Sequence, residues 1–157
     1  MIAVLQRVKR AAVTVDNRVV GKIDSGLLVL LGVREGDNEK DAELLAAKIA
    51  KCRIFTDSED KMNLSVTDIG GGVLVVSNFT LLANYRRGNR PDFMDAAAPA
   101  RANELYEYFT EQMRREVANV ATGEFGAEMQ IDLAADGPIT IVMDSEVLKQ
   151  PKRGVSR

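Results

Sequence analysis

The strongest constraint on the fold is a strict alternation of apolar and polar side chains. It covers residues 127–133, where every second residue is apolar and the residues between are Glu128, Gln130 and Asp132. Because successive side chains of a strand point to opposite faces, this pattern predicts a β-strand with one buried face. Residues 139–143 repeat the alternation after a short interruption, so the last third of the chain is expected to be mostly sheet.

Strand patterns also dominate the first third of the chain. Short apolar segments separated by turn residues predict strands at 2–8, 12–15, 19–23 and 27–33. Asp16-Asn17-Arg18 reads as the turn of a hairpin.

Two longer segments have helical spacing instead. Asp37 or Asn38 is expected to cap the first, in which apolar residues recur at helical intervals up to Cys52. Pro99 is expected to begin the second, whose stripe of Leu105, Phe109 and Met113 predicts core packing. The fold class is therefore expected to be α+β, with a mixed, largely antiparallel sheet and two longer helices. The basic tail, residues 144–157, is expected to be loosely ordered.

The composition limits the chemistry. The chain has no histidine and one cysteine, Cys52, so a Ser-His triad, a His-ligated metal and a cysteine-rich zinc site are excluded, and no cofactor is expected. Its 21 basic and 23 acidic residues argue against coating long nucleic acids but leave room for a local contact with an RNA end. The amino terminus lacks the pattern of a secretory signal, which makes the cytoplasm the expected location.

Three segments contain residues that could have a functional role in addition to a structural one. Ser77-Asn78-Phe79-Thr80 follows an apolar strand and offers donors that could hold a carbonyl or an oxyanion, although polar residues also end strands for solubility. Asp136-Gly137-Pro138 reads as a hairpin turn, with a cis Gly-Pro bond as the functional alternative. Arg86, Arg87 and Arg90 form either a solvated loop or a contact with phosphate at an RNA end.

Together the segments of this chain resemble the D-aminoacyl-tRNA deacylase family in order and spacing. The likeness covers residues 1–143 and rests on six segments, which are Met1 to Val8, Lys61 to Leu64, Val75 to Leu81, Gly88 to Phe93, Thr122 to Ala127 and Asp136 to Thr140. Asn78 stands where the family has Gln, and Ala135 stands where it has Asn.

The resemblance implies a barrel-like core and a homodimer that hydrolyses the ester between a D-amino acid, or glycine, and the terminal adenosine of tRNA. The catalytic residues it implies are Ser77, Asn78, Phe79 and Thr80. The substrate-binding residues are expected to be Arg7, Phe125, Met129, Gly137 and Pro138. The Gly137-Pro138 bond would be cis, supported by Arg7, and would enter the partner subunit's pocket.

The residues agree with a hydrolysis that needs no histidine. Backbone amides near Phe79 and Thr80 are expected to hold the carbonyl oxygen, and the 2′-hydroxyl of the terminal ribose to help activate water. Thr80 is either a nucleophile or an orienting hydroxyl, and the lack of a base favours the second role. The alternatives are a relative acting on L-aminoacyl-tRNA and a non-catalytic module that binds the tRNA end.

Overall fold

The computed structural model describes residues 1–152 and 154 and contains one large and one small sheet. The large sheet consists of β1 (Ile2–Val15), β2 (Arg18–Ile23), β3 (Gly26–Gly32), β6 (Gly72–Ser77), β7 (Asn119–Thr122) and β8 (Gln130–Asp144). The small sheet pairs β4 (Phe55–Thr56) with β5 (Met62–Leu64). The helices are α1 (Glu39–Ala50), α2 (Pro99–Glu116), α3 (Ser145–Lys149) and the short 3-10 helix η1 (Phe79–Leu82).

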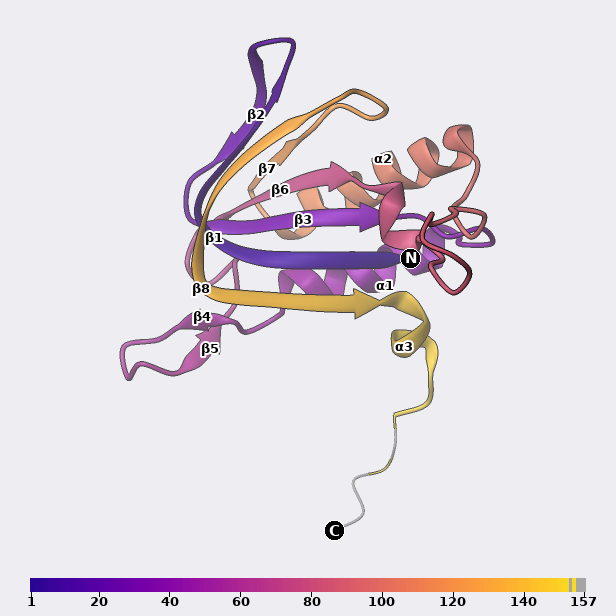
Figure 1. Cartoon of the computed structure of the whole chain (residues 1–157). Helices are drawn as coiled ribbons and strands as arrows, with labels where there is room; N and C mark the ends of the chain where they lie inside the picture. The colour runs from indigo at the N-terminus through magenta and orange to yellow at the C-terminus, as the bar shows by residue number, and fades with distance from the viewer. Residues whose placement is uncertain (153, 155–157) are drawn as a thin grey trace.

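The large sheet is mixed and nearly closed. Its order is β2-β1-β3-β6-β7, and β8 pairs with β1 outside this path (Figure 1). β1 is antiparallel to its three partners, whereas β6 is parallel to both β3 and β7, so α1 and α2 lie in the crossovers. The ends of the path meet at Gly21, where a Cβ would collide with the carbonyl oxygen of Thr122. The expected α+β fold class with a barrel-like core is confirmed.

The main core lies between the sheet and the two long helices, which lie behind the sheet in Figure 1. The stripe of α2 is fully buried at Leu105, Phe109 and Met113, so the expected core packing is confirmed. Asn38 caps α1 with a capping box: its side chain accepts from the N–H of Lys40, and the Asp41 carboxylate accepts from the N–H of Asn38.

Two expected strand breaks are wrong. The first is between residues 8 and 12, because β1 is continuous and only bends where its pairing with β8 shifts register around Val8. The second is the hairpin turn at residues 134–138, which instead lie inside β8. Both halves of β8 pair with the same strand β1, so the chain follows the bend of β1 and does not reverse.

The expectation of a loosely ordered tail is wrong for residues 144–149. Asp144 caps α3 by accepting from the N–H of Glu146, and Ser145 is completely buried. The Ser145 hydroxyl donates to Asp41 Oδ1 at 2.7 Å, and Lys149 Nζ lies 2.7 Å from the same oxygen. Of this tail, residues 153 and 155–157 lie outside the described part. In that described part, no helix has the length and apolar character required to cross a membrane.

Candidate active site

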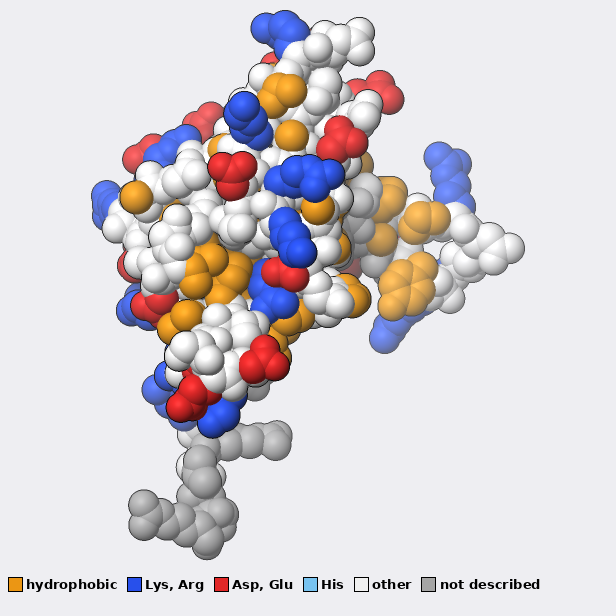
Figure 2. All heavy atoms as spheres, turned by 90° about the vertical axis from the view of Figure 1, so that its left-hand side faces the viewer, with side chains coloured by type: hydrophobic (Ala, Val, Ile, Leu, Met, Phe, Trp, Pro, Cys, Tyr) orange, Lys and Arg blue, Asp and Glu red, His pale blue; other side chains and the backbone are white. Residues whose placement is uncertain are grey.

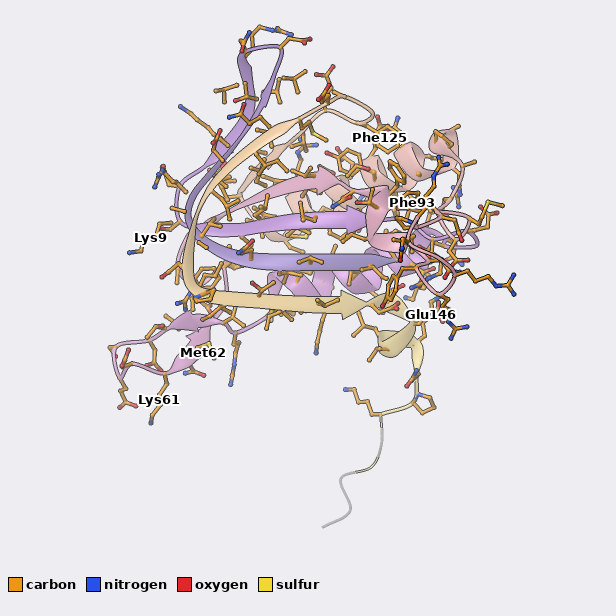
Figure 3. All side chains as sticks on the ribbon, viewed as in Figure 1. Lys9, Lys61, Met62, Phe93, Phe125 and Glu146 are labelled. Atoms are coloured by element: carbon orange, nitrogen blue, oxygen red, sulfur yellow. The ribbon has the colours of Figure 1, made fainter. Side chains whose placement is uncertain are left out.

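A cavity of about 580 Å³ opens where β3 and β6 end. Its walls are the residues just after these strands, the segment that leads into α2 and the segment that leads into β8. In Figure 3, Phe93 and Phe125 mark this end of the sheet, and Lys9, Lys61 and Met62 lie at the opposite end. Side chains from four distant parts of the sequence therefore share one hollow.

The loop after β6 is held by specific hydrogen bonds. The N–H of Asn78 donates to the carbonyl of Leu31 at 2.8 Å, which continues the ladder between β3 and β6 by one residue. The Thr80 hydroxyl donates to Asn78 Oδ1. Phe79 and Thr80 are the first residues of η1, so their backbone N–H groups have no partner within that helix. Neither N–H group donates to a backbone carbonyl among the described residues, and Phe79 itself lines the cavity, so these groups are candidate donors at its edge.

The cavity wall is uncharged. Among the described residues that line it there is no Asp, Glu, Lys or Arg, and Ser77 and Asn78 supply its polar side chains. Phe79 is 56% exposed and its ring meets that of Phe93 edge-on, with 5.1 Å between the ring centres. A site of this kind can hold a neutral group and polarise it, but offers no carboxylate or ammonium for proton transfer.

Tyr106, behind the cavity, is a structural donor. Its ring lies 5.9 Å from that of Phe125, and its hydroxyl donates to the carbonyl of Val75 at 3.0 Å. Burial raises the pKa of Tyr106 to about 12, against the smaller opposite effect of a hydrogen bond with Thr122. The hydroxyl therefore stays protonated and ties α2 to β6.

The Gly137-Pro138 segment lies elsewhere in the chain. It lies on β8 opposite Arg7 of β1. Ser77 lies three strands away across the sheet, on β6, and is level with Ala3 of β1. The distance between Ser77 and the Gly137-Pro138 segment is therefore on the order of 20 Å. The peptide bond is cis and both residues are exposed. Gly137 has φ +130°, and a Cβ there would lie 2.7 Å from the backbone nitrogen of Ile139, so this position requires glycine.

Arg7 fixes the backbone just before this segment. The side chain is nearly buried, and Nε donates to the carbonyl oxygen of Asp136 at 3.2 Å and lies 3.3 Å from its carboxylate. Another guanidinium nitrogen donates to the carbonyl of Ile54 at 2.9 Å. Arg7 therefore ties β8 to the segment before β4.

In the part of the chain that the structure describes, three carboxylates approach the geometry of a metal site, those of Asp37, Asp41 and Glu146. Each already has a cationic partner in the protein: the amino group of Met1 lies 2.8 Å from Asp37, and Lys149 contacts both Asp41 and Glu146. This cluster fastens α3 to α1 and lies apart from the cavity wall.

Comparison with known proteins identifies the family. The family model described as D-Tyr-tRNA(Tyr) deacylase matches residues 4–144. The chain belongs to this family. It is 56% identical over 146 residues to a D-aminoacyl-tRNA deacylase of Koribacter versatilis, covering 93% of this chain and 98% of the relative. It is 54% identical over 157 residues to one of Chloroflexus aurantiacus, covering 100% and 98%.

Two solved structures share this deacylase fold. One is a c-Myc DNA unwinding element binding protein, with a TM-score of 0.87, 39% identity and coverage of 92% of this chain and 98% of that chain. The other is a probable eukaryotic D-amino acid tRNA deacylase, with a TM-score of 0.76 and coverage of 90% and 97%. Its 16% identity shows the common fold only.

The structure brings together only part of the site predicted from the deacylase motifs. Five of the predicted residues line the cavity: Ser77, Asn78, Phe79, Phe125 and Met129. Thr80 is joined to them through Asn78. Arg7, Gly137 and Pro138 do not reach the cavity of their own chain. Sequence reasoning missed the wall made by Val33 and residues 96–99, because alanines before a proline carry no chemical signal.

Proposed function

We propose that this chain hydrolyses the ester that joins a D-amino acid, or glycine on a non-cognate tRNA, to the terminal adenosine of tRNA. The observation that carries the proposal is the cavity whose described lining residues are uncharged and include Phe79, at the start of η1. Family membership supports this reaction class. We also propose the cytoplasm as the compartment in which it acts.

Catalysis would come from positioning and oxyanion stabilisation. An aminoacyl ester is an activated bond, so two N–H donors on the developing oxyanion supply much of what the reaction needs. The 2′-hydroxyl of the terminal ribose would help to activate water, since none of the described residues that line the cavity has a charged side chain. The Thr80 proton is already donated to Asn78, which supports an orienting role over a nucleophilic one.

The site would be completed by a second copy of the chain. Gly137 and Pro138 are exposed, held by the contacts of Arg7 and about 20 Å from the cavity of their own chain. In a homodimer with two-fold symmetry, this segment of one protomer can enter the cavity of its partner. Carbonyl groups there would hold the substrate's amino group and leave no room for an L side chain, which accounts for acceptance of both D-amino acids and glycine.

The reaction is tested with a matched pair of substrates. The purified protein should deacylate D-Tyr-tRNA and leave L-Tyr-tRNA intact, as measured by release of labelled tyrosine. Equal rates for the two isomers would overturn the proposed specificity.

The shared site is tested by mixing two inactive variants. Gly137→Val would block the inserted segment, and Phe79→Pro would remove an N–H donor at the first residue of η1. After equal amounts are unfolded and refolded together, about a quarter of the sites should combine two intact halves and regain activity. No recovery in mixtures shown to contain mixed dimers would contradict a site built from two chains.

A further inference from the structure

Residues 84–91 form a basic loop, here named the arginine loop, between η1 and α2. Its eight residues include three arginines, Arg86, Arg87 and Arg90, and no acidic residue. The loop is closed at its base by an antiparallel bridge in which the N–H of Asn84 donates to the carbonyl of Asp92 at 2.8 Å and the reverse bond is 2.9 Å. The loop is therefore a defined hairpin-like projection.

The three guanidinium groups are free to bind an anion. All three arginines are exposed, and no ion pair joins them to a carboxylate in the part of the chain that the structure describes. The neighbouring carboxylate of Asp92 accepts from the backbone N–H of Met94 at 3.2 Å. Elsewhere charges of both signs are interspersed, as on the face formed by the bends of β1 and β8 (Figure 2). Three arginines within eight residues that include no acidic residue thus stand out in a chain of net charge −2, although Asp92 and Asp95 follow the loop.

An aromatic ring is exposed in the same loop. Tyr85 is 80% exposed, and with Ala83, Asn84, Arg86 and Asp95 it lines a hollow of about 330 Å³. Exposed aromatic rings interleaved with basic side chains form a surface that binds single-stranded nucleic acid, because bases stack on the rings and arginines bind phosphates.

The arginine loop is continuous with the candidate active site. Phe93 lies two residues after the end of the loop and packs edge-on against Phe79 in the cavity wall. Asp95 lines the hollow beside Tyr85, and the next residue, Ala96, lines the cavity. A bound nucleic-acid strand that leaves the cavity past Phe93 would therefore meet the arginine loop next.

We infer that the arginine loop binds the unpaired 3′ nucleotides of tRNA that precede the terminal adenosine. Tyr85 stacks on one of their bases, and Arg86, Arg87 and Arg90 contact their phosphates. This inference rests on the proposed function and adds to it the part of the substrate that the loop recognises. The loop takes no part in the chemical step, so it contributes to KM for tRNA and not to ester cleavage itself.

The test compares tRNA with a minimal substrate. In the triple variant Arg86→Ala, Arg87→Ala, Arg90→Ala, KM for D-Tyr-tRNA should rise by roughly 10- to 50-fold near physiological salt, because three phosphate contacts are lost. The rate on 3′-O-D-tyrosyl-adenosine, which has no phosphate, should stay within about twofold, since no loop residue lines the cavity. Tyr85→Ala should raise KM by roughly fivefold or more, and Tyr85→Phe should not.

A matched control removes three basic residues from the opposite end of the molecule. Arg18, Lys22 and Lys61 are exposed and lie on the β2 hairpin and near β5 (Figures 1 and 3), so replacing them with Ala gives the same change in net charge. This control should leave KM for tRNA close to that of the unmodified protein. An equal rise in KM in both triple variants would overturn the inference and indicate a general charge effect.

Binding of uncharged tRNA gives a readout that is independent of catalysis. The salt dependence of binding, measured by fluorescence anisotropy, should become less steep by about two units in the arginine triple variant. A tRNA lacking its unpaired 3′ nucleotides should bind the triple variant and the unmodified protein equally. A persistent difference on the truncated tRNA would overturn the inference. If the unmodified protein cleaves neither substrate, the proposed function fails, whereas an unchanged KM in the triple variant refutes only the role of the loop.

Discussion

Replacing Arg7 by Met tests how the structure holds the Gly137-Pro138 segment. Met keeps the apolar stem but removes the hydrogen bonds to the carbonyls of Asp136 and Ile54. A hydrogen bond from a charged donor contributes about 1.5–3 kcal/mol, so the two together, taken at the lower end of this range, predict a loss of about 3 kcal/mol in the free energy of unfolding. The ion pair with the Asp136 carboxylate adds little, since that side chain is 36% exposed.

The assay is denaturant unfolding at neutral pH, followed by thermal unfolding of the same variant. For a chain of this length the expected decrease in Tm is roughly 6–12 °C. Arg114→Met is the matched control, because Arg114 forms an exposed pair with Glu111 worth about 0.3–0.5 kcal/mol. Deacylation measured where both variants are folded should fall much further for Arg7→Met, because the segment before Gly137 loses its support. Equal stability losses in the two variants would refute the reasoning.

Two further predictions concern the hydroxyl in the active-site loop and the carboxylate beneath α3. Thr80→Ala should keep most of the single-turnover rate on D-Tyr-tRNA, because the role proposed for Thr80 is to orient Asn78 through their hydrogen bond. Complete loss of activity in a folded variant would favour a covalent route. Burial opposes ionisation of Asp41, but hydrogen bonds from Lys149, Ser145 and the backbone of Asn38 outweigh it and lower its pKa from 3.8 to about 2. Because the folded pKa is the lower one, this stabilisation of about 2 kcal/mol is complete above roughly pH 4 and lost as the pH falls toward 2. Urea unfolding across this range should show the decline, and Asp41→Asn should flatten it; an unchanged slope in the variant would contradict the assignment.

Much of the fold could be predicted from local patterns. The helix cap at Asn38 and the buried stripe of α2 depend on side chains within a few residues of one another, and both are present. The breaks expected in β1 and at residues 134–138 are wrong because polar and breaker residues also occur where a long strand bends. Whether the chain reverses or bends at such a point depends on its partner strand, which local sequence does not specify.

The candidate site divides in the same way. The sequence predicted that Ser77, Asn78 and Phe79 follow an apolar strand, and in the structure all three line the cavity. The Val33 and alanine part of that wall was not predicted, because small apolar residues contribute shape without a recognisable chemical pattern.

The sequence by itself determined the class of chemistry. A chain without histidine and with one cysteine must use hydroxyls, amides, carboxylates or the substrate, and its motifs placed it among the deacylases. Only the tertiary structure decided which groups share a cavity: it gathered Phe79, Phe125 and Met129 and left Gly137 and Pro138 exposed across the sheet. The physical reason is that strand pairing fixes distances between residues remote in sequence, and the order of motifs along a chain contains no information about those distances.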